Sequence, residues 1–313
     1  MNFIIIAVCA FFLSAVFSPI ESLSWWAGWN SETDIILELE DILNKKQKKN
    51  DIPHEHKHYI IYFSGIGAAA ARVLPAKDQR FLASLRSQLP DAVIISDIFP
   101  YSAASKDLLS PHRKSLYWKT LYKIFKDQKG FLVGIAVNTH NVFQVLVSTD
   151  RRYAPIYNLG IAKTVTAKLI AQGYRIGSNE NITIIGWSAG AQIAVSVSGY
   201  LKTILQTDIQ VISIGGFVSD NPGFSYINYF TYIRGTRDIY AVIAYIFSPG
   251  RWFITRNSPW NRMKRAGKIS LVKLPKIMHN GKYGYFGLIK RNGQTNLDLT
   301  TTTVLKIIDR YNL

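Results

Sequence analysis

Short apolar runs alternate with longer amphipathic segments along most of the chain. Runs of β-branched and aromatic residues predict six strands, at 59–63, 92–96, 182–185, 210–214, 229–233 and 269–274. Segments with helical spacing lie among and after them, at 77–88, 155–172, 189–205, 239–247 and 297–311. Strands that are apolar on both faces and alternate with helices are typical of a parallel sheet covered on both sides. The pattern predicts an α/β protein with a doubly wound, mainly parallel sheet of about six strands.

The segment before the first strand has a different pattern. Residues 3–17 are apolar except for Ser14, and three tryptophans follow within 25–29. We expect residues 1–20 to be a signal segment or a short membrane anchor, with the indole rings at the membrane interface. The protein would then be membrane-associated, or secreted if the segment is cleaved. Residues 31–44 have the spacing of an acidic amphipathic helix, so 21–57 is interpreted as that helix and a linker.

A long stretch separates the second and third predicted strands. It contains a basic, aromatic segment that begins at Ser110-Pro111, followed by an apolar segment at 131–147. We interpret 101–154 as a helical insertion in a domain that spans 58–313. One hypothesis makes this insertion a lid over a lipophilic pocket, with lysines that meet phosphates of a membrane surface. The alternative is a pair of ordinary packing helices.

The composition limits which partners and which kinds of binding site we expect. Lys and Arg outnumber Asp and Glu by 37 to 20, which favours anionic membranes or polyanions. The basic residues are scattered and accompany no nucleic-acid motif, so no nucleic-acid partner is expected. The single cysteine, Cys9, excludes an intrachain disulfide and a cysteine-based zinc site. The cluster HEHKH at 54–58 lacks a carboxylate or cysteine arranged to complete a metal site, so we interpret it as a solvated linker and expect no metal.

The motif GWSAG at 186–190 lies between a predicted strand and a predicted helix. A serine at such a turn is held in a strained conformation, so the residues two before and two after it must be small, as Gly186 and Gly190 are. Ser188 would point out at the carboxyl end of the sheet and act as a nucleophile.

A nucleophilic serine needs a base and a carboxylate that orients the base. Among six histidines, His279 directly follows the last predicted strand, where catalytic groups of a doubly wound sheet gather; His140 is the weaker candidate. Asp238 and Asp220 both follow strands between Ser188 and His279. We favour Asp238, for which helix capping or pairing with Arg237 is the alternative role, and keep Asp220 in reserve.

The negative charge that develops on a substrate carbonyl requires converging backbone N–H groups. Ala189, directly after the nucleophile, would supply one. The other would come from the loop Ser64-Gly65-Ile66-Gly67 after the first strand, where small residues allow a close approach. We choose the Ile66 N–H, with Gly67 next.

Residues 58–313 resemble the α/β-hydrolase superfamily. The resemblance lies in the loop FSGIG, the elbow GWSAG, the acid in GTRD and the histidine in MHNGKYG, in the chain order Ser, Asp, His. It implies hydrolysis of an ester or thioester through an acyl-enzyme on Ser188, without a cofactor. The sequence departs from the family in two ways: the antiparallel hairpin before the first crossover is not visible, and the gap between 210–214 and 229–233 is short for a helix.

The apolar N-terminus and aromatic insertion favour a lipophilic ester as substrate. Two alternatives stay open at this point. The same three residues serve an acyltransferase, which passes the acyl group to an alcohol or lipid. A non-catalytic member of the fold would bind a ligand or partner at the membrane.

Overall fold

The computed structural model describes residues 2–26, 58–71, 73–103, 131–178, 180–291 and 293–311. The chain forms two compact units. We call Met1–Glu55, Ile66–Val73 and Asp97–Gly173 the helical unit, and His56–Gly65, Leu74–Ser96 and Tyr174–Leu313 the sheet unit.

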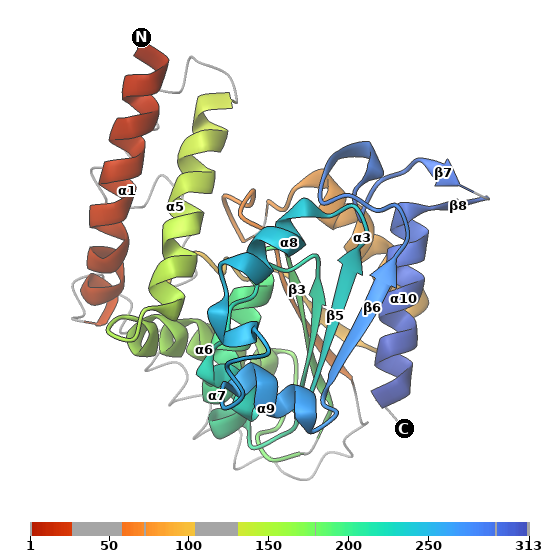
Figure 1. Ribbon diagram of the computed structural model, residues 1–313. Coiled ribbons are helices and arrows are strands. Elements are labelled where there is room, and N and C mark those ends of the chain that lie inside the picture. Colours follow the sequence, from red (N-terminus) through yellow and green to blue (C-terminus); the bar gives the residue numbers. More distant parts are fainter. Residues whose placement is uncertain are drawn as a thin grey trace. The chain divides into compact units, whose positions relative to one another are not determined.

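The sheet unit contains a six-stranded sheet in the order β2-β1-β3-β4-β5-β6, and every pair of neighbours is parallel (Figure 1). All six predicted strands are present, so the predicted parallel α/β sheet is confirmed. The bounds are β1 (Tyr59–Phe63), β2 (Val93–Ile95), β3 (Ile182–Trp187), β4 (Ile209–Ile214), β5 (Tyr229–Gly235) and β6 (Ile269–Leu274). The central strands β1, β3 and β4 are buried along their whole length, which explains their unbroken apolar sequences.

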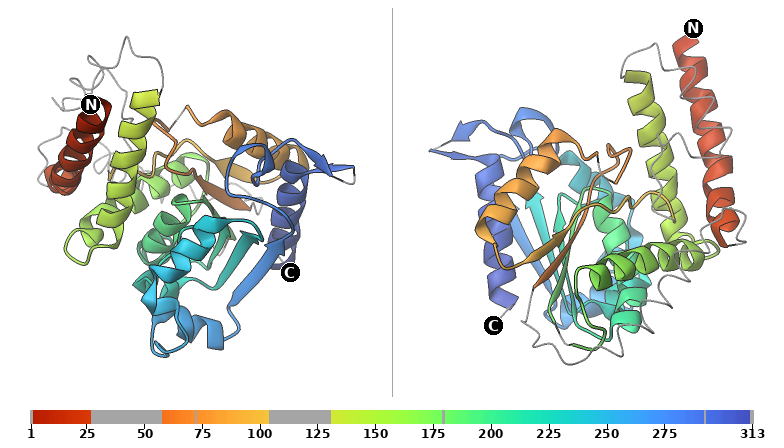
Figure 2. Two further views of the ribbon diagram at one scale, coloured as in Figure 1. Left: turned by 45° about the horizontal axis from the view of Figure 1, so that its top comes forward. Right: turned by 180° about the vertical axis from the view of Figure 1, so that it is seen from behind.

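Helices lie on both faces of this sheet (Figure 2). On one face α3 contacts α10, and on the other α7 contacts β1, β3 and β4. The helices of the unit are α3 (Ala76–Gln88), α7 (Gly190–Leu205), α8 (Ile239–Ile246), α9 (Pro259–Arg265) and α10 (Asn296–Tyr311). Short 3₁₀ turns and a hairpin complete it: η1 (Pro222–Tyr226), η2 (Pro249–Arg251), η3 (Gly281–Tyr283), β7 (Lys290–Arg291) and β8 (Gln294–Thr295). The gap after β4 holds only η1, as its length predicted.

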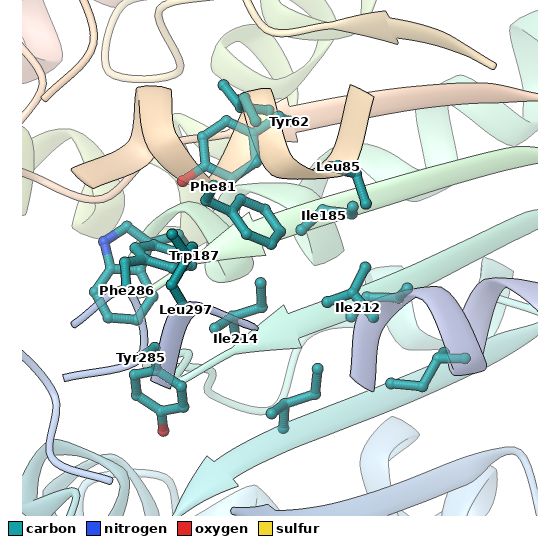
Figure 3. Packing of buried hydrophobic residues seen from close by; sticks show 14 of the residues in the cluster. Tyr62, Phe81, Leu85, Ile185, Trp187, Ile212, Ile214, Tyr285, Phe286 and Leu297 are labelled. Carbon is teal, nitrogen blue, oxygen red and sulfur yellow. The ribbon is translucent and has the colours of Figure 1, made fainter. Parts of the chain in front are cut away.

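The core beneath α3 and α10 is built from alternate residues of the strands, because successive side chains of a strand point to opposite faces. It includes Tyr62 of β1, Ile185 and Trp187 of β3, and Ile212 and Ile214 of β4. Figure 3 shows these side chains with Phe81, Tyr285, Phe286 and Leu297 around them. Trp187, the second residue of the GWSAG motif, is thereby packed into the core at the carboxyl edge of the sheet.

The helical unit contains α1 (Asn2–Trp26), α5 (Phe131–Thr149) and α6 (Ala154–Ala171). Phe11 of α1 meets Phe143 of α5 edge-on at 5.1 Å between ring centroids. The Gln144 amide of α5 donates to Glu21 Oε2 of α1 at 2.9 Å. The amide of Asn141 donates to the backbone oxygens of Ile66 and Ala68, at 2.6 and 2.8 Å, which fixes the loop after β1.

Some of the predicted segments fall within this unit. The apolar part of the predicted insertion is α5, and the predicted helix at 155–172 is α6. The predicted helix at 31–44 and the basic, aromatic segment after Ser110-Pro111 lie outside the described residues. Side chains of α1 are described from Phe11 to Leu23. Within the described part of the chain, no helix is long and apolar enough to cross a bilayer. The assignment of residues 1–20 to a signal segment or membrane anchor stays a prediction.

Candidate active site

The GWSAG motif forms a sharp turn between β3 and α7. β3 ends at Trp187 and α7 begins at Gly190. Ser188 has a φ of 53°, in the left-handed region that residues with a side chain rarely adopt. Its N–H donates to Ile214 O of the neighbouring strand at 3.0 Å. The hydrogen bond to β4 holds the turn, and the Ser188 side chain is presented at the carboxyl edge of the sheet.

The two glycines of the motif are required by backbone contacts. A Cβ on Gly186 would collide with the backbone of Ala191 in the first turn of α7. A Cβ on Gly190 would lie 2.5 Å from the backbone oxygens of both Phe63 and Ser64. These contacts confirm the sequence-based requirement for small residues on each side of the serine, since any larger residue would push the strand, the helix or the β1 loop apart.

His279 lies in the loop after β6, as predicted. Its Nε2 is 2.9 Å from Ser188 Oγ, within hydrogen-bond reach. The loop is closed by the N–H of Met278, which donates to Tyr283 O at 2.9 Å. The imidazole stacks on the indole of Trp187, with 4.8 Å between the ring centroids and 22° between the planes. Stacking and loop closure together fix the orientation of the ring toward the serine.

Asp238 holds the opposite nitrogen of the same imidazole. Its Oδ2 is 3.0 Å from His279 Nδ1, and the residue is 2 % exposed. Its Oδ1 accepts the N–H of Tyr240 at 3.0 Å, so Asp238 is also the N-cap of α8. The two roles considered from the sequence therefore coexist, one on each oxygen. A carboxylate on Nδ1 favours the tautomer in which Nε2 is free to accept the serine proton.

Tyr285 is a member of this cluster that sequence reasoning missed. Its hydroxyl donates to Asp238 Oδ2 at 2.8 Å and accepts the N–H of Gly235, the last residue of β5, at 2.6 Å. Burial, with the negative charge of Asp238 next, raises the pKa of Tyr285, so the hydroxyl keeps its proton and remains a donor. The tyrosine thus ties the carboxylate to the end of β5. No local sequence motif predicts this role of Tyr285, because Gly235 and Tyr285 lie 50 residues apart.

The loop after β1 approaches the elbow closely through Gly65. A Cβ on this residue would lie 2.9 Å from indole atoms of Trp187 and 3.3 Å from Ser188 Cβ. Ala189 lies directly before α7, at a helix start that leaves N–H groups unpaired. Ile66 and Gly67 begin the part of the β1 loop that belongs to the helical unit. Their roles and that of Ala189 in binding an oxyanion stay predictions.

Asp220 and His140, the second choices for the acid and the base, have other partners. Asp220 Oδ1 accepts the N–H of Trp260 at 2.9 Å, in the first turn of α9, which is where a carboxylate stabilises a helix. His140 belongs to the helical unit, where its Nε2 lies 3.0 Å from Glu21 Oε2. Of the candidate bases and acids, the structure brings His279 to Ser188 and Asp238 to His279.

His58 is the one described histidine of the predicted linker cluster. It is partly buried, and its Nε2 lies 2.8 Å from Thr183 Oγ1 of β3. Burial lowers its pKa to about 4. The interpretation of this residue as solvated linker is therefore wrong, because the ring packs against the sheet. Among the described residues, no group of three or more histidine, cysteine or acidic side chains is placed to hold a metal ion.

The three side chains follow β3, β5 and β6 and meet at the carboxyl edge of a parallel sheet, with the serine on a strained turn between strand and helix. Their chain order is Ser, Asp, His. A serine on such an elbow, followed along the chain by the acid and then the histidine, is characteristic of α/β-hydrolases. The chain has the α/β-hydrolase fold. The six parallel strands and their flanking helices fit it, and no antiparallel strand precedes the first crossover in the part of the chain that the structure describes.

Comparison with known proteins finds solved structures that are similar to this chain. No protein-family model matches the chain, and no curated protein matches it. It is similar to a carboxylesterase from Mesorhizobium loti, at 10 % identity over 80 % of this chain and 90 % of that one, with a TM-score of 0.43. A dienelactone hydrolase-like promiscuous phosphotriesterase from metagenomic libraries has 9 % identity, with 82 % and 87 % of the two chains covered and a TM-score of 0.42.

A third similar structure, of esterase PE8, has 15 % identity over 80 % of this chain and 93 % of that one, with a TM-score of 0.42. At these low identities and TM-scores the likenesses add nothing to the assignment of the α/β-hydrolase fold. That assignment rests on the sheet order, the elbow and the three side chains at its carboxyl edge.

Proposed function

We propose that the protein is a serine hydrolase that cleaves a carboxylic ester or thioester through an acyl-enzyme on Ser188. The observation that carries the proposal is the continuous hydrogen-bonded relay from Ser188 Oγ through His279 to Asp238, at 2.9 and 3.0 Å. A serine hydroxyl is a weak nucleophile until a neighbouring base takes its proton, and this geometry supplies the base and its orienting carboxylate.

The reaction would proceed in two stages. His279 Nε2 takes the proton of Ser188 as Oγ attacks the carbonyl carbon, and the carbonyl oxygen becomes an oxyanion bound by the N–H groups of Ala189 and Ile66. The imidazolium then gives its proton to the leaving alcohol or thiol as its bond to carbon breaks. In the second stage water attacks the acyl-enzyme, His279 takes a proton from that water, and Ser188 regains its hydrogen as the acid departs. Asp238 stays ionised and stabilises the imidazolium in both stages.

The proposed preference for a lipophilic ester is supported by exposed apolar side chains beside the relay. α8 begins directly after Asp238, and Ile239 and Tyr240 at its start are 64 % and 49 % exposed. The ring of Tyr240 lies 4.6 Å from that of His279, so the apolar surface reaches the base itself. Exposed apolar surface next to a reacting group suits an apolar substrate.

The test is hydrolysis of 4-nitrophenyl esters with acyl chains from two to sixteen carbons by the full chain, with Ser188→Ala as the control. We expect turnover that rises with chain length and is lost in Ser188→Ala, and an intact mass increased by the acyl group when the reaction is quenched early. Absence of turnover with every chain length would overturn the proposal. Equal rates for all chain lengths would overturn only the lipophilic preference.

A further inference from the structure

A cavity of about 490 Å³ is lined in part by His279. Its walls are the rings of Trp187 and Phe286, and three cationic residues line it: Lys77, Arg80 and Lys282. Among the described residues that line this cavity, none is acidic. All of these residues belong to the sheet unit. The cavity therefore combines an apolar wall with positive charge and touches the base of the proposed relay.

Lys77 is held at this cavity by two contacts. Its Nζ donates to Asn280 Oδ1 at 2.6 Å and lies 5.0 Å from the centre of the Trp187 ring system. Since Trp187 stacks on His279 at 4.8 Å, the ammonium group lies within about 10 Å of the imidazole. An ammonium group carries three donor hydrogens, and Asn280 takes one of them.

The surroundings favour a negative charge near Lys77. Burial lowers the pKa of Lys77, which means that solvent alone does not fully satisfy the charge; Asp78 acts in the opposite direction. The carboxyl of Asp78 is buried and does not line the cavity. Lys77 and Arg80 lie in the first and second turns of α3, and the N-cap residue Pro75 makes no side-chain hydrogen bond, so the helix dipole adds positive potential at the same place.

We infer that this cavity binds an anionic group, carboxylate or phosphate, carried by the alcohol part of the ester. The inference rests on the proposed function, because it uses the direction of proton transfer. His279 Nε2 must donate its proton to the leaving oxygen, so the alcohol part is the part of the substrate nearest the imidazole. An alcohol with an anion a few bonds from its ester oxygen reaches Lys77, while its carbon skeleton contacts the wall of Trp187 and Phe286.

The substrates that test this differ by one carboxylate: 4-nitrophenyl acetate and 5-acetoxy-2-nitrobenzoate, both of which release a coloured phenol. The readout is the ratio of kcat/KM for the anionic ester to that for the neutral ester. We expect the wild-type ratio to exceed one and to fall as NaCl is added, because salt screens partly exposed charges. It should fall at least fivefold in Lys77→Met and in Lys282→Met.

Lys306→Met is the matched control. Lys306 is exposed on α10, does not line the cavity, and its replacement removes the same charge from the protein, so the ratio should stay within twofold of wild type. Lys282 is exposed as well, so its variant tests the inference even if Lys77→Met fails to fold. A ratio of one or less in the wild type, or a ratio unchanged in Lys282→Met and Lys77→Met, would overturn the inference.

Binding without turnover separates the two proposals. The product 5-hydroxy-2-nitrobenzoate is titrated into Ser188→Ala by calorimetry, with inorganic phosphate as competitor and 4-nitrophenol as the neutral comparison. Binding to Ser188→Ala that depends on Lys77 and Lys282, together with a wild-type protein that hydrolyses neither ester, would contradict the proposed function and support the anion site. Turnover of both esters without selectivity would support the function and contradict the anion site. Competition by phosphate distinguishes a general oxyanion site from one specific for carboxylate.

Discussion

Two pairs of a histidine and a carboxylate among the described residues, one in each unit, differ in what surrounds them. In the sheet unit, His279 lies between Asp238 on Nδ1 and the hydroxyl of Ser188 on Nε2. In the helical unit, His140 lies between the amide oxygen of Asn141 at 3.1 Å on Nδ1 and Glu21 at 3.0 Å on Nε2. The same residue types serve a different purpose in each place. A relay requires the carboxylate on one nitrogen and a strained nucleophile on the other, and only the first of these two pairs has that arrangement.

Replacing the histidine of each pair should separate the two roles. His279→Ala and Ser188→Ala should each lower kcat for ester hydrolysis by roughly 10⁴-fold or more, because either change removes the activated nucleophile. His140→Gln should leave kcat within about twofold and lower the free energy of unfolding by about 1–3 kcal/mol, since it removes the contacts of the buried ring with Asn141 and Glu21. Steady-state kinetics and urea unfolding provide both readouts. Loss of activity in His140→Gln with unchanged stability would contradict the assignment.

The two candidate acids should also differ in their effect on activity. Asp238→Asn should lower kcat by roughly 10³- to 10⁴-fold, because an amide on Nδ1 favours the wrong imidazole tautomer. Asp220→Asn keeps an oxygen that accepts the N–H of Trp260, so its activity should be close to wild type. Both variants preserve volume, and circular dichroism checks that both fold. Equal activity of the two variants would mean that Asp238 does not orient His279.

Replacing a glycine of the GWSAG turn tests how tightly the backbone is packed around Ser188, the nucleophile of the His279 pair. Gly190→Ala should lower the free energy of unfolding by about 3 kcal/mol and reduce activity, because the added Cβ meets the backbone oxygens of Phe63 and Ser64. The control is Gly67→Ala, at a position where a Cβ meets no atom within 4 Å. Thermal unfolding with matched activity assays gives the comparison. A Gly190→Ala protein as stable as Gly67→Ala would show that the elbow is looser than described.

The partly buried His58 should affect stability alone. Its pKa is about 4 in the folded protein and 6.5 in the unfolded chain, so the unfolded chain binds the extra proton between these values. Its contribution to stability, about 3 kcal/mol, is therefore complete above pH 6.5 and lost as the pH falls toward 4.

Asp78 acts in the opposite sense, because burial raises its pKa from 3.8 to about 6 and favours the folded state in acid. The measurement is therefore the difference in unfolding free energy between wild type and His58→Gln at several pH values, in which the term from Asp78 cancels. We expect this difference to change by about 3 kcal/mol between pH 7 and pH 4. A constant difference would contradict a partly buried His58 that stays neutral in the folded protein.

Tyr285 is a positioning residue, so its replacement should lower activity less than replacement of the three relay residues. Tyr285→Phe removes the hydrogen bond to Asp238 Oδ2 and leaves the N–H of Gly235 without its acceptor. We expect kcat/KM to fall about tenfold, and the acidic limb of its pH profile to move to higher pH, because an Asp238 carboxylate with one donor fewer attracts the proton on His279 more strongly. Tyr283→Phe is the control on the same loop. A uniform loss of activity with an unmoved pH profile would indicate a purely structural role.

Much of this arrangement was predictable from the sequence. The central strands were predictable because buried parallel strands are apolar on both faces, and Ser188, Asp238 and His279 each follow a strand of the sheet. Tyr285 and Lys77 were not predicted, since their contacts with Asp238 and Asn280 join segments 47 and 203 residues apart. The seven-residue helix α9 and the hairpin of β7 and β8 were also missed, because elements this short carry too few residues for a periodic signal.

Covalent labelling of the full chain by a fluorophosphonate probe would report whether Ser188 is activated. The wild type should be labelled at one site, located at Ser188 by peptide mass spectrometry. Labelling should disappear in Ser188→Ala and in His279→Ala, and persist in His140→Gln. A wild type that stays unlabelled in the presence of detergent, or labelling that survives in His279→Ala at the wild-type rate, would contradict the relay.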